Sequence, residues 1–203
     1  MIRKATLADI PHLIRAVKLS EETGYELYTY KSLFNLDDIS FEEKFNAVLR
    51  TEVAGHNLTY HDFFIYESEG QPAGVFSFYK EGSNGNSAHI ATGVLMENFS
   101  RQDLAAGFGK LAKFKSIQFG KTIGVYQLDS VSVFPEFRGQ GIFGKMLKEA
   151  FNAVSPDETP RVEIQVWAGN TSALRAYEKE GFIIKETKLM EGSDKGRVLM
   201  ANF

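Results

Sequence analysis

The sequence predicts a mixed α/β fold, and three observations lead to this prediction. Runs in which apolar residues alternate with a period of two, typical of strands, are interspersed with runs of period 3.6, typical of helices. The clearest stretch reads strand, loop, helix and strand over residues 126–167, which is a β-α-β unit. The length of 203 residues equals roughly 1.4 average domains. We therefore expect one domain over residues 1–203 with an added segment.

The N-terminal part predicts a short strand followed by two helices. The strand covers residues 2–5. Asp9 is expected to cap the first helix, in which Pro11 is tolerated because the N–H at that position has no helical partner. An aromatic-rich loop at residues 25–30 separates this helix from a second one that begins at Ser40. A strand followed by two helices is consistent with the mixed class.

The middle of the chain predicts a pair of strands and then an insertion. Residues 63–66 and 73–79 are strand-like, and residues 67–72 between them contain the Gly and Pro of a hairpin connection. Residues 81–123 are more than a connection between two strands requires, and a loop of that length without its own structure is uncommon. A capping box at Ser100 predicts a helix there. We expect a helical insertion that acts as a lid or pocket wall.

The C-terminal part carries the clearest pattern. Its β-α-β unit has a broad apolar stripe on the helix, suited to packing on a sheet. A further helix stops at Gly181, and two strands follow it. The expected elements are a strand at 126–133, a loop at 134–137, a helix at 141–153, a strand at 162–167, a helix at 170–180, and strands at 182–190 and 197–201.

The composition excludes several functional classes. There is no Cys, so the chain contains no disulfide, thiolate nucleophile or Cys-based metal site. The net charge of −3 lacks the basic excess that nucleic-acid binding uses. No apolar run approaches the about 18 residues of a membrane span, so we expect a cytoplasmic protein without membrane contact. His12, His56, His61 and His89 show no metal-ligand spacing, and we expect no metal.

A glycine-rich loop at residues 137–145 lies between a predicted strand and a predicted helix. Backbone N–H groups and the helix dipole make such a position an anion site, so phosphate binding is the chemical inference. A dinucleotide fold needs an acid at the end of the next strand, but Glu163 lies at its start. A Walker loop needs Ser or Thr after Lys145, but Met146 follows it. A third alternative is that the glycines serve only a tight turn.

A second motif further along the chain favours a different interpretation of the glycine-rich loop. The sequence resembles the GNAT superfamily of acetyl-CoA-dependent N-acetyltransferases. Its first signature, Arg/Gln-x-x-Gly-x-Gly/Ala, is matched by Arg138 and Gly141, although Phe143 stands where a second small residue is usual. Its second signature is matched by Asn170, Ala173, Tyr177, Gly181 and Phe182. The resemblance implies a central mixed, mostly antiparallel twisted sheet flanked by helices, with residues 81–123 inserted between the third and fourth strands.

The resemblance also implies acetyl-CoA as co-substrate and a set of residues that bind it. Main-chain groups of Val131, Ser132 and Val133 would pair with the pantetheine arm, and an N–H near Val131 would hold the oxyanion. Asn170, Ala173 and Tyr177 would share one helix face toward the cofactor, with Tyr177 as general acid for the departing thiolate. Backbone N–H groups of the glycine turn would hold the diphosphate, from Arg138, Gly139, Gln140, Gly141, Ile142, Phe143 and Gly144.

The acceptor amine must lose a proton before it attacks, since an amine with a pKa of about 10.4 is almost fully charged at pH 7. Asp129 shares strand parity with Val131 and Val133, so its carboxylate is expected to face the reaction centre as base or acceptor-orienting group. The alternative is an ordinary strand carboxylate. An acidic and aromatic set could receive a cationic or aromatic amine, or could be a solvated surface: Glu21, Glu22, Glu26, Asp37 and Asp38 with Tyr25, Tyr28 and Tyr30.

The expected function is therefore transfer of the acetyl group of acetyl-CoA to a primary amine, on a small molecule or a free amino group. Attack is direct, because there is no Cys and no activated Ser to form a covalent intermediate. The alternative is a non-catalytic acyl-CoA sensor that uses the same pocket. We expect a monomer or homodimer.

Overall fold

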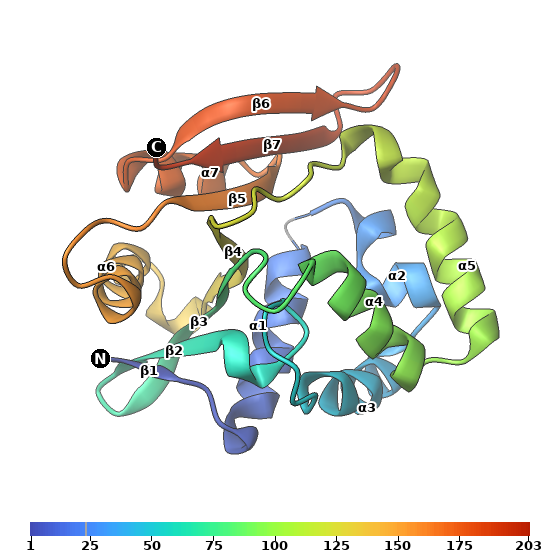
Figure 1. The fold of residues 1–203 in the computed structure, drawn as a ribbon, viewed down its shortest axis with the longest axis horizontal. Coiled ribbons are helices and arrows are strands. Elements are labelled where there is room, and N and C mark those ends of the chain that lie inside the picture. Colours follow the sequence, from blue (N-terminus) through green and yellow to red (C-terminus); the bar gives the residue numbers. More distant parts are fainter. Residues whose placement is uncertain (23) are drawn as a thin grey trace.

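One seven-stranded sheet organises the computed structural model, which describes residues 1–22 and 24–203 (Figure 1). The strand order is β1-β2-β3-β4-β5-β7-β6. Neighbouring strands are antiparallel except β4 and β5, which are parallel. The prediction of a mixed, mostly antiparallel sheet is confirmed. The strands are β1 (Ile2–Lys4), β2 (Phe63–Ser68), β3 (Gln71–Lys80), β4 (Tyr126–Val133), β5 (Val162–Trp167), β6 (Ile183–Leu189) and β7 (Gly196–Ala201).

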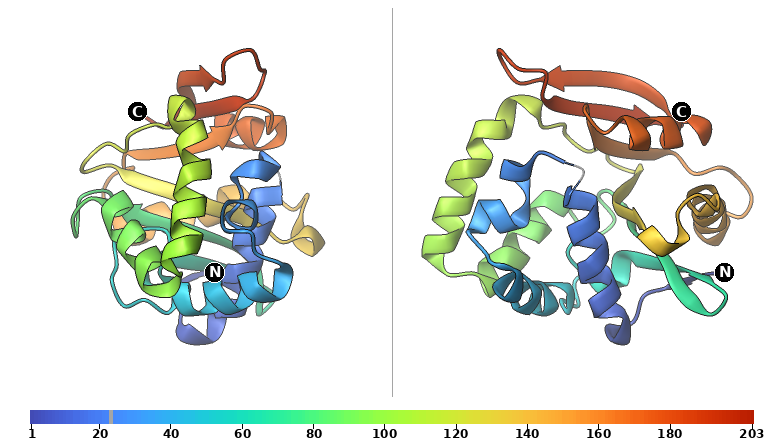
Figure 2. Two further views of the ribbon diagram at one scale, coloured as in Figure 1. Left: turned by 90° about the vertical axis from the view of Figure 1, so that its right-hand side faces the viewer. Right: turned by 180° about the vertical axis from the view of Figure 1, so that it is seen from behind.

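Helices cover both faces of this sheet (Figures 1 and 2). The first five gather over one face, while α6 and α7 pack on the other. The α-helices are α1 (Ile10–Glu22), α2 (Tyr30–Phe34), α3 (Asp38–Leu49), α4 (Ser87–Asn98), α5 (Arg101–Leu111), α6 (Ile142–Val154) and α7 (Thr171–Lys179). Short 3-10 turns lie at Leu7–Asp9, Glu26–Tyr28, Tyr60–Asp62, Ala112–Ile117 and Pro135–Phe137. Among the described residues, no helix is long and apolar enough to cross a membrane.

Two hydrophobic cores follow from this layering, one on each face of the sheet. In β2, Phe63 and Ile65 belong to the core beneath α1 to α5, whereas Phe64 and Tyr66 belong to the core beneath α6 and α7. All four side chains are buried, which explains the continuous apolar run of this strand. A residue's position in the alternation therefore decides which group of helices it meets.

The N-terminus of α1 differs in detail from the prediction. Asp9 does not cap α1 directly but closes the 3-10 turn that precedes it. The backbone N–H of Thr6 donates to Asp9 Oδ2 at 2.8 Å, and Arg3 forms an ion pair with the same carboxylate at 2.8 Å. Two cationic or N–H partners stabilise the ionised acid, and the pKa of Asp9 lies well below its usual value, first because of the Arg3 hydrogen bond.

The predicted insertion contains two helices rather than one. Ser100 caps α5 as expected, and its hydroxyl accepts from the backbone N–H of Asp103 at 3.1 Å. The preceding helix α4 was not predicted, because its apolar residues do not form one stripe. Gly107 of α5 lies against the ring of Phe34 in α2, with no room for a Cβ. The insertion therefore packs on the N-terminal helices.

Candidate active site

The β4–β5 fork is the central feature of the site: the region beyond Leu128 and Ile164 where the two strands no longer pair. Their parallel register stops at that pair, although both strands continue. Residues 129–133 of β4 therefore turn one edge toward β5 without forming strand pairs there. Such an edge can pair with an extended ligand as if with another strand.

A β-bulge in β4 lies at the start of the fork. Its register against β3 passes from Ser77 opposite Asp129 to Val75 opposite Ser132, so β4 carries one extra residue. Within this step Ser130 has a φ of 50°, the left-handed conformation. The N–H of Ser130 donates to Asp129 Oδ1 at 2.8 Å. This local bond supports the unusual backbone.

The bulge places Asp129 on a different face from Val131 and Val133. The expectation that its side chain shares a face with Val131 and Val133 is wrong. Asp129 and Ser132 lie on the face covered by α1, where Ser132 Oγ donates to the carbonyl of Ala16 at 2.8 Å. Val131 and Val133 pack against the opposite core, beneath α6 and α7. The extra residue shifts the period-two alternation by one, which moves every following side chain to the other face.

The glycine turn follows β4 and leads into α6. Gly139 and Gly141 have φ of 77° and 68°, and Gly141 is the N-cap residue of α6. A Cβ on either would meet nothing within 4 Å, so conformation and not packing requires glycine there. No side chain caps the N-terminus of α6 among the described residues. An open turn with uncapped N–H groups fits a diphosphate.

The other residues of the glycine turn have different surroundings. Arg138 donates through Nε to the carbonyl of Val133 at 3.2 Å, which ties the turn to the end of β4, while Gln140 is exposed. Ile142 is buried in the core beneath α6 and α7. A Cβ on Gly144 would lie 2.5 Å from Glu180 Oε1, so glycine admits that carboxylate beside α6. The side chain of Arg138 is exposed, so this turn offers an anion a guanidinium as well as backbone N–H groups.

Helix α7 positions the second motif. Asn170 is its N-cap, and the Asn170 Oδ1 accepts from the backbone N–H of Ala173 at 3.0 Å. Tyr177 is 5% exposed and meets the ring of Phe143 edge-on at 5.1 Å. Phe143, the departure from the family signature, therefore packs on Tyr177. Burial raises the pKa of Tyr177 well above its usual value, with a further contribution from Asp129, so the phenol is protonated at neutral pH.

The acidic and aromatic set is divided by the structure. Glu21 accepts from the backbone N–H of Tyr30 at 2.8 Å, and the charge of Asp129 acts on both residues. Asp37 caps α3, and Asp38 forms ion pairs with lysines. Glu22 and Glu26 are exposed, and Tyr25 and Tyr28 pack edge-on against Phe114 and Trp167.

A buried polar cluster near Asp129 was not predicted. Lys121 Nζ donates to the Tyr79 hydroxyl and to Ser87 Oγ, the latter at 3.2 Å. Burial lowers the pKa of Lys121, while Asp129 and Glu81 oppose that shift. The sequence signal for this cluster is a pair of polar residues, Ser77 and Tyr79, at inward-facing positions of a predicted strand. Among the described residues there is no group of three or more metal-ligating side chains.

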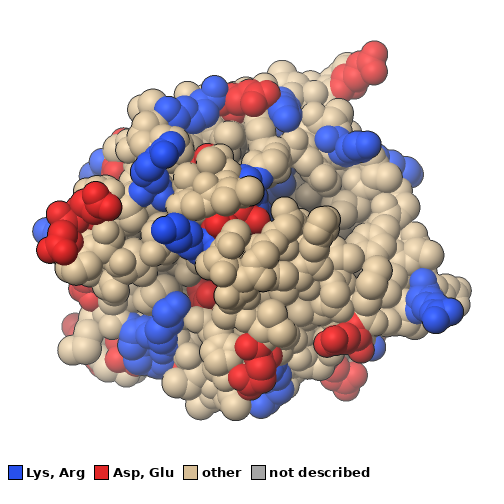
Figure 3. Space-filling model, viewed as in Figure 1, with Lys and Arg blue, Asp and Glu red and all other residues tan. Residues whose placement is uncertain are grey.

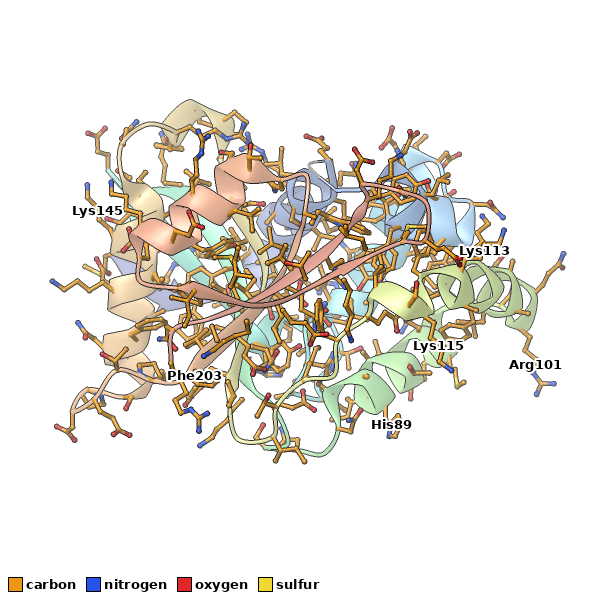
Figure 4. The ribbon with its side chains drawn as sticks, turned by 90° about the horizontal axis from the view of Figure 1, so that it is seen from above. His89, Arg101, Lys113, Lys115, Lys145 and Phe203 are labelled. Carbon is orange, nitrogen blue, oxygen red and sulfur yellow. The ribbon has the colours of Figure 1, made fainter. Side chains whose placement is uncertain are left out.

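Lys145, the lysine of the Walker alternative, and two lysines that follow α5 lie outside this centre. Lys145 is exposed on α6 at one end of the molecule, and Figure 4 shows Lys113 and Lys115 at the other end. These side chains are therefore solvated.

Comparison with known proteins identifies the family. The model of the acetyltransferase (GNAT) family matches residues 30–182. The chain belongs to this family. GNAT membership agrees with both signatures and with the mixed sheet. No curated protein sequence matches the chain.

Several solved structures share the GNAT fold with this chain. An N-acetyltransferase from Staphylococcus aureus Mu50 aligns with a TM-score of 0.71 and 17% identity over 99% of each chain. A ribosomal-protein-alanine N-acetyltransferase from Brucella melitensis aligns with a TM-score of 0.53 and 18% identity over 99% of this chain and 98% of the other. At these identities the likeness shows the fold.

Proposed function

We propose that this GNAT protein transfers the acetyl group of acetyl-CoA directly to a primary amine, on a small molecule or a free amino group. The observation that carries the proposal is that β4 forms the fork and is followed in the chain by the open turn of Gly139 and Gly141. The turn would hold the diphosphate, and the edge of Val131 to Val133 would pair with the pantetheine amides.

The transfer step needs stabilisation of an oxyanion and of a leaving thiolate. The amine nitrogen forms a bond to the thioester carbonyl carbon, and the carbon–sulfur bond then breaks. An N–H near Val131 as oxyanion donor would contribute about 3 kcal/mol. Tyr177 would donate to the sulfur. Because its raised pKa makes full proton transfer to a thiolate uphill, the main contribution of Tyr177 is a hydrogen bond.

Asp129 remains our candidate for base or acceptor-orienting group. Its carboxylate lies on the α1 face, so an acceptor would enter from that side. The surface drawn in Figure 3 carries charges of both signs and no broad basic area, which supports a small acceptor over a nucleic acid. A cytoplasmic location and a monomeric or homodimeric state stay predictions from the sequence.

Two measurements on the full chain test this function. Calorimetry with acetyl-CoA measures binding, and thiol release with a panel of primary amines measures turnover, with the acetylated amine identified by mass spectrometry. We expect binding and amine-dependent thiol release. Binding without turnover of any amine would favour the alternative, a non-catalytic acyl-CoA sensor. Absence of binding would refute both.

A further inference from the structure

Helix α1 runs antiparallel to β4 and carries Glu21 to the bulge. The ring of His12 lies 6.3 Å from that of Phe134, and one turn later the carbonyl of Ala16 accepts from Ser132. Each turn of the helix advances about 5.4 Å, close to two residues of a strand. Continuing this register places the end of α1 beside Asp129, whose charge acts on Glu21.

The Glu21 carboxylate is half-buried and is fixed in place. Its Oε1 accepts from the backbone N–H of Tyr30 at 2.8 Å, which ties the end of α1 to the start of α2. Among the described residues Glu21 forms no ion pair within 4.0 Å. A carboxylate near a helix C-terminus also faces the negative end of the helix dipole. The charge of Lys31 acts on Glu21, but Lys31 is paired with Asp38, so a cation is favoured beside Glu21.

Ser77 supplies an independent observation that points to a ligand. It stands directly opposite Asp129 on β3, and residues paired in this way point to the same face. Ser77 is 0% exposed, and its hydroxyl has no hydrogen-bond partner in the described structure. A buried hydroxyl without a partner is uncommon and costs free energy. Its side chain lies on the same face as that of Asp129, where a donor would satisfy it.

We propose that Glu21 takes the proton of the acceptor's ammonium group, which Asp129 and Ser77 hold beside it. This inference rests on the proposed acetyl transfer and makes the acceptor a cationic primary amine. The ammonium gives one proton to Glu21, and the neutral amine attacks the thioester. After the attack, a second proton leaves the nitrogen and protonates the sulfur of the thiolate, so that coenzyme A leaves as the thiol. Glu21 then returns its proton to solvent.

The electrostatics of the site support this division of roles. Burial, followed by the charge of Asp129, raises the pKa of Glu21 to about 7, and the bonds to Tyr30 and the charge of Lys31 oppose the rise. Lys31 is itself engaged with Asp38 at 2.8 Å. A base with a pKa near the working pH combines the right protonation state with enough driving force.

Steady-state kinetics of Glu21→Gln between pH 6 and 9.5 test the proposal, using acetyl-CoA and the amine panel. The carboxamide keeps an oxygen for the Tyr30 N–H but cannot take a proton. We expect kcat/KM at pH 7 to fall about 100-fold or more. The rising limb of the pH profile of kcat/KM should move from near pH 7 in the wild type toward the pKa of the amine in the variant. The difference in kcat/KM between the variant and the wild type should become smaller toward pH 9.5, because about a tenth of an amine of pKa 10.4 is already neutral there.

Controls separate this role from a structural one. Glu43→Gln changes an exposed glutamate of α3 and should match the wild type. Calorimetry should give Glu21→Gln an unchanged affinity for acetyl-CoA. The inference is overturned if the kcat/KM profile of Glu21→Gln keeps the rising limb of the wild type, or if kcat/KM falls by the same factor at every pH. It is also overturned if Asp129→Asn moves the rising limb and Glu21→Gln does not. If acetyl-CoA binds but the wild type acetylates no amine, the proposed function fails first.

Discussion

The unpartnered hydroxyl of Ser77 allows stability and activity to be separated in one variant. Because this hydroxyl is fully buried without a partner, the folded protein bears its desolvation, about 1–3 kcal/mol. Ser77→Ala removes that cost and loses only the packing of one oxygen atom. We expect a net gain of about 1 kcal/mol, which raises Tm by about 2–4 °C for a chain of this size.

The same variant should weaken the acceptor site. A hydrogen bond to a charged group contributes about 1.5 kcal/mol or more, so losing it should lower kcat/KM for the amine about tenfold. The affinity for acetyl-CoA should not change, because Ser77 lies on the face opposite α6 and α7. Urea unfolding, thiol-release kinetics and calorimetry measure the three quantities.

A matched control is available in Ser87, whose buried hydroxyl accepts from Lys121 at 3.2 Å. Ser87→Ala leaves that donor short of a partner and should destabilise the protein by about 1 kcal/mol or more. Should Ser77→Ala also destabilise by that amount, the Ser77 hydroxyl is satisfied in the folded protein and the reasoning fails. An unchanged kcat/KM for the amine would remove Ser77 from the acceptor site.

Three other variants test separate parts of the site. Tyr177→Phe should lower kcat and leave the affinity for acetyl-CoA unchanged; an unaltered kcat in the steady-state assay would remove Tyr177 from the mechanism. Gly141→Ala should cost about 1 kcal/mol in urea unfolding, because its φ of 68° is left-handed; no loss would contradict that conformation. The pKa of Glu21 rises from 4.5 to about 7 on folding, so its ionisation costs stability as pH increases through that range. The free energy of unfolding of Glu21→Gln, relative to that of the wild type, should therefore rise by up to about 3 kcal/mol between pH 4.5 and pH 8. If urea unfolding gives the same difference at every pH, the raised pKa of Glu21 is refuted.

Local patterns explain what the sequence predicted well. The β-α-β unit, the glycine turn and the helix that follows Asn170 depend on residues close together in the chain, whose spacing sets their geometry directly. Tyr177 follows from the same helix periodicity. These elements carry the proposed cofactor side of the site.

The acceptor side depends on contacts between distant parts of the chain. The bulge places a serine in a left-handed conformation, and nothing in the local sequence around Ser130 marks it as Gly would. The proximity of Glu21 and Asp129 results from the packing of α1 along β4, and Lys121 enters from the last residues of the insertion. Helix α4 lacked a single apolar stripe. Periodicity alone therefore could not assemble this half.

The bulge at Ser130 connects the two halves of the site. In a regular strand Val131 and Val133 would face α1 together with Asp129. The left-handed residue costs about 1–2 kcal/mol, partly offset by its bond to Asp129, and such strain persists where function requires it. Direct transfer needs a thioester from one face and an amine from the other to meet. Because β4 separates from β5 directly after Leu128, both faces open onto the same fork, at the bulge of Ser130.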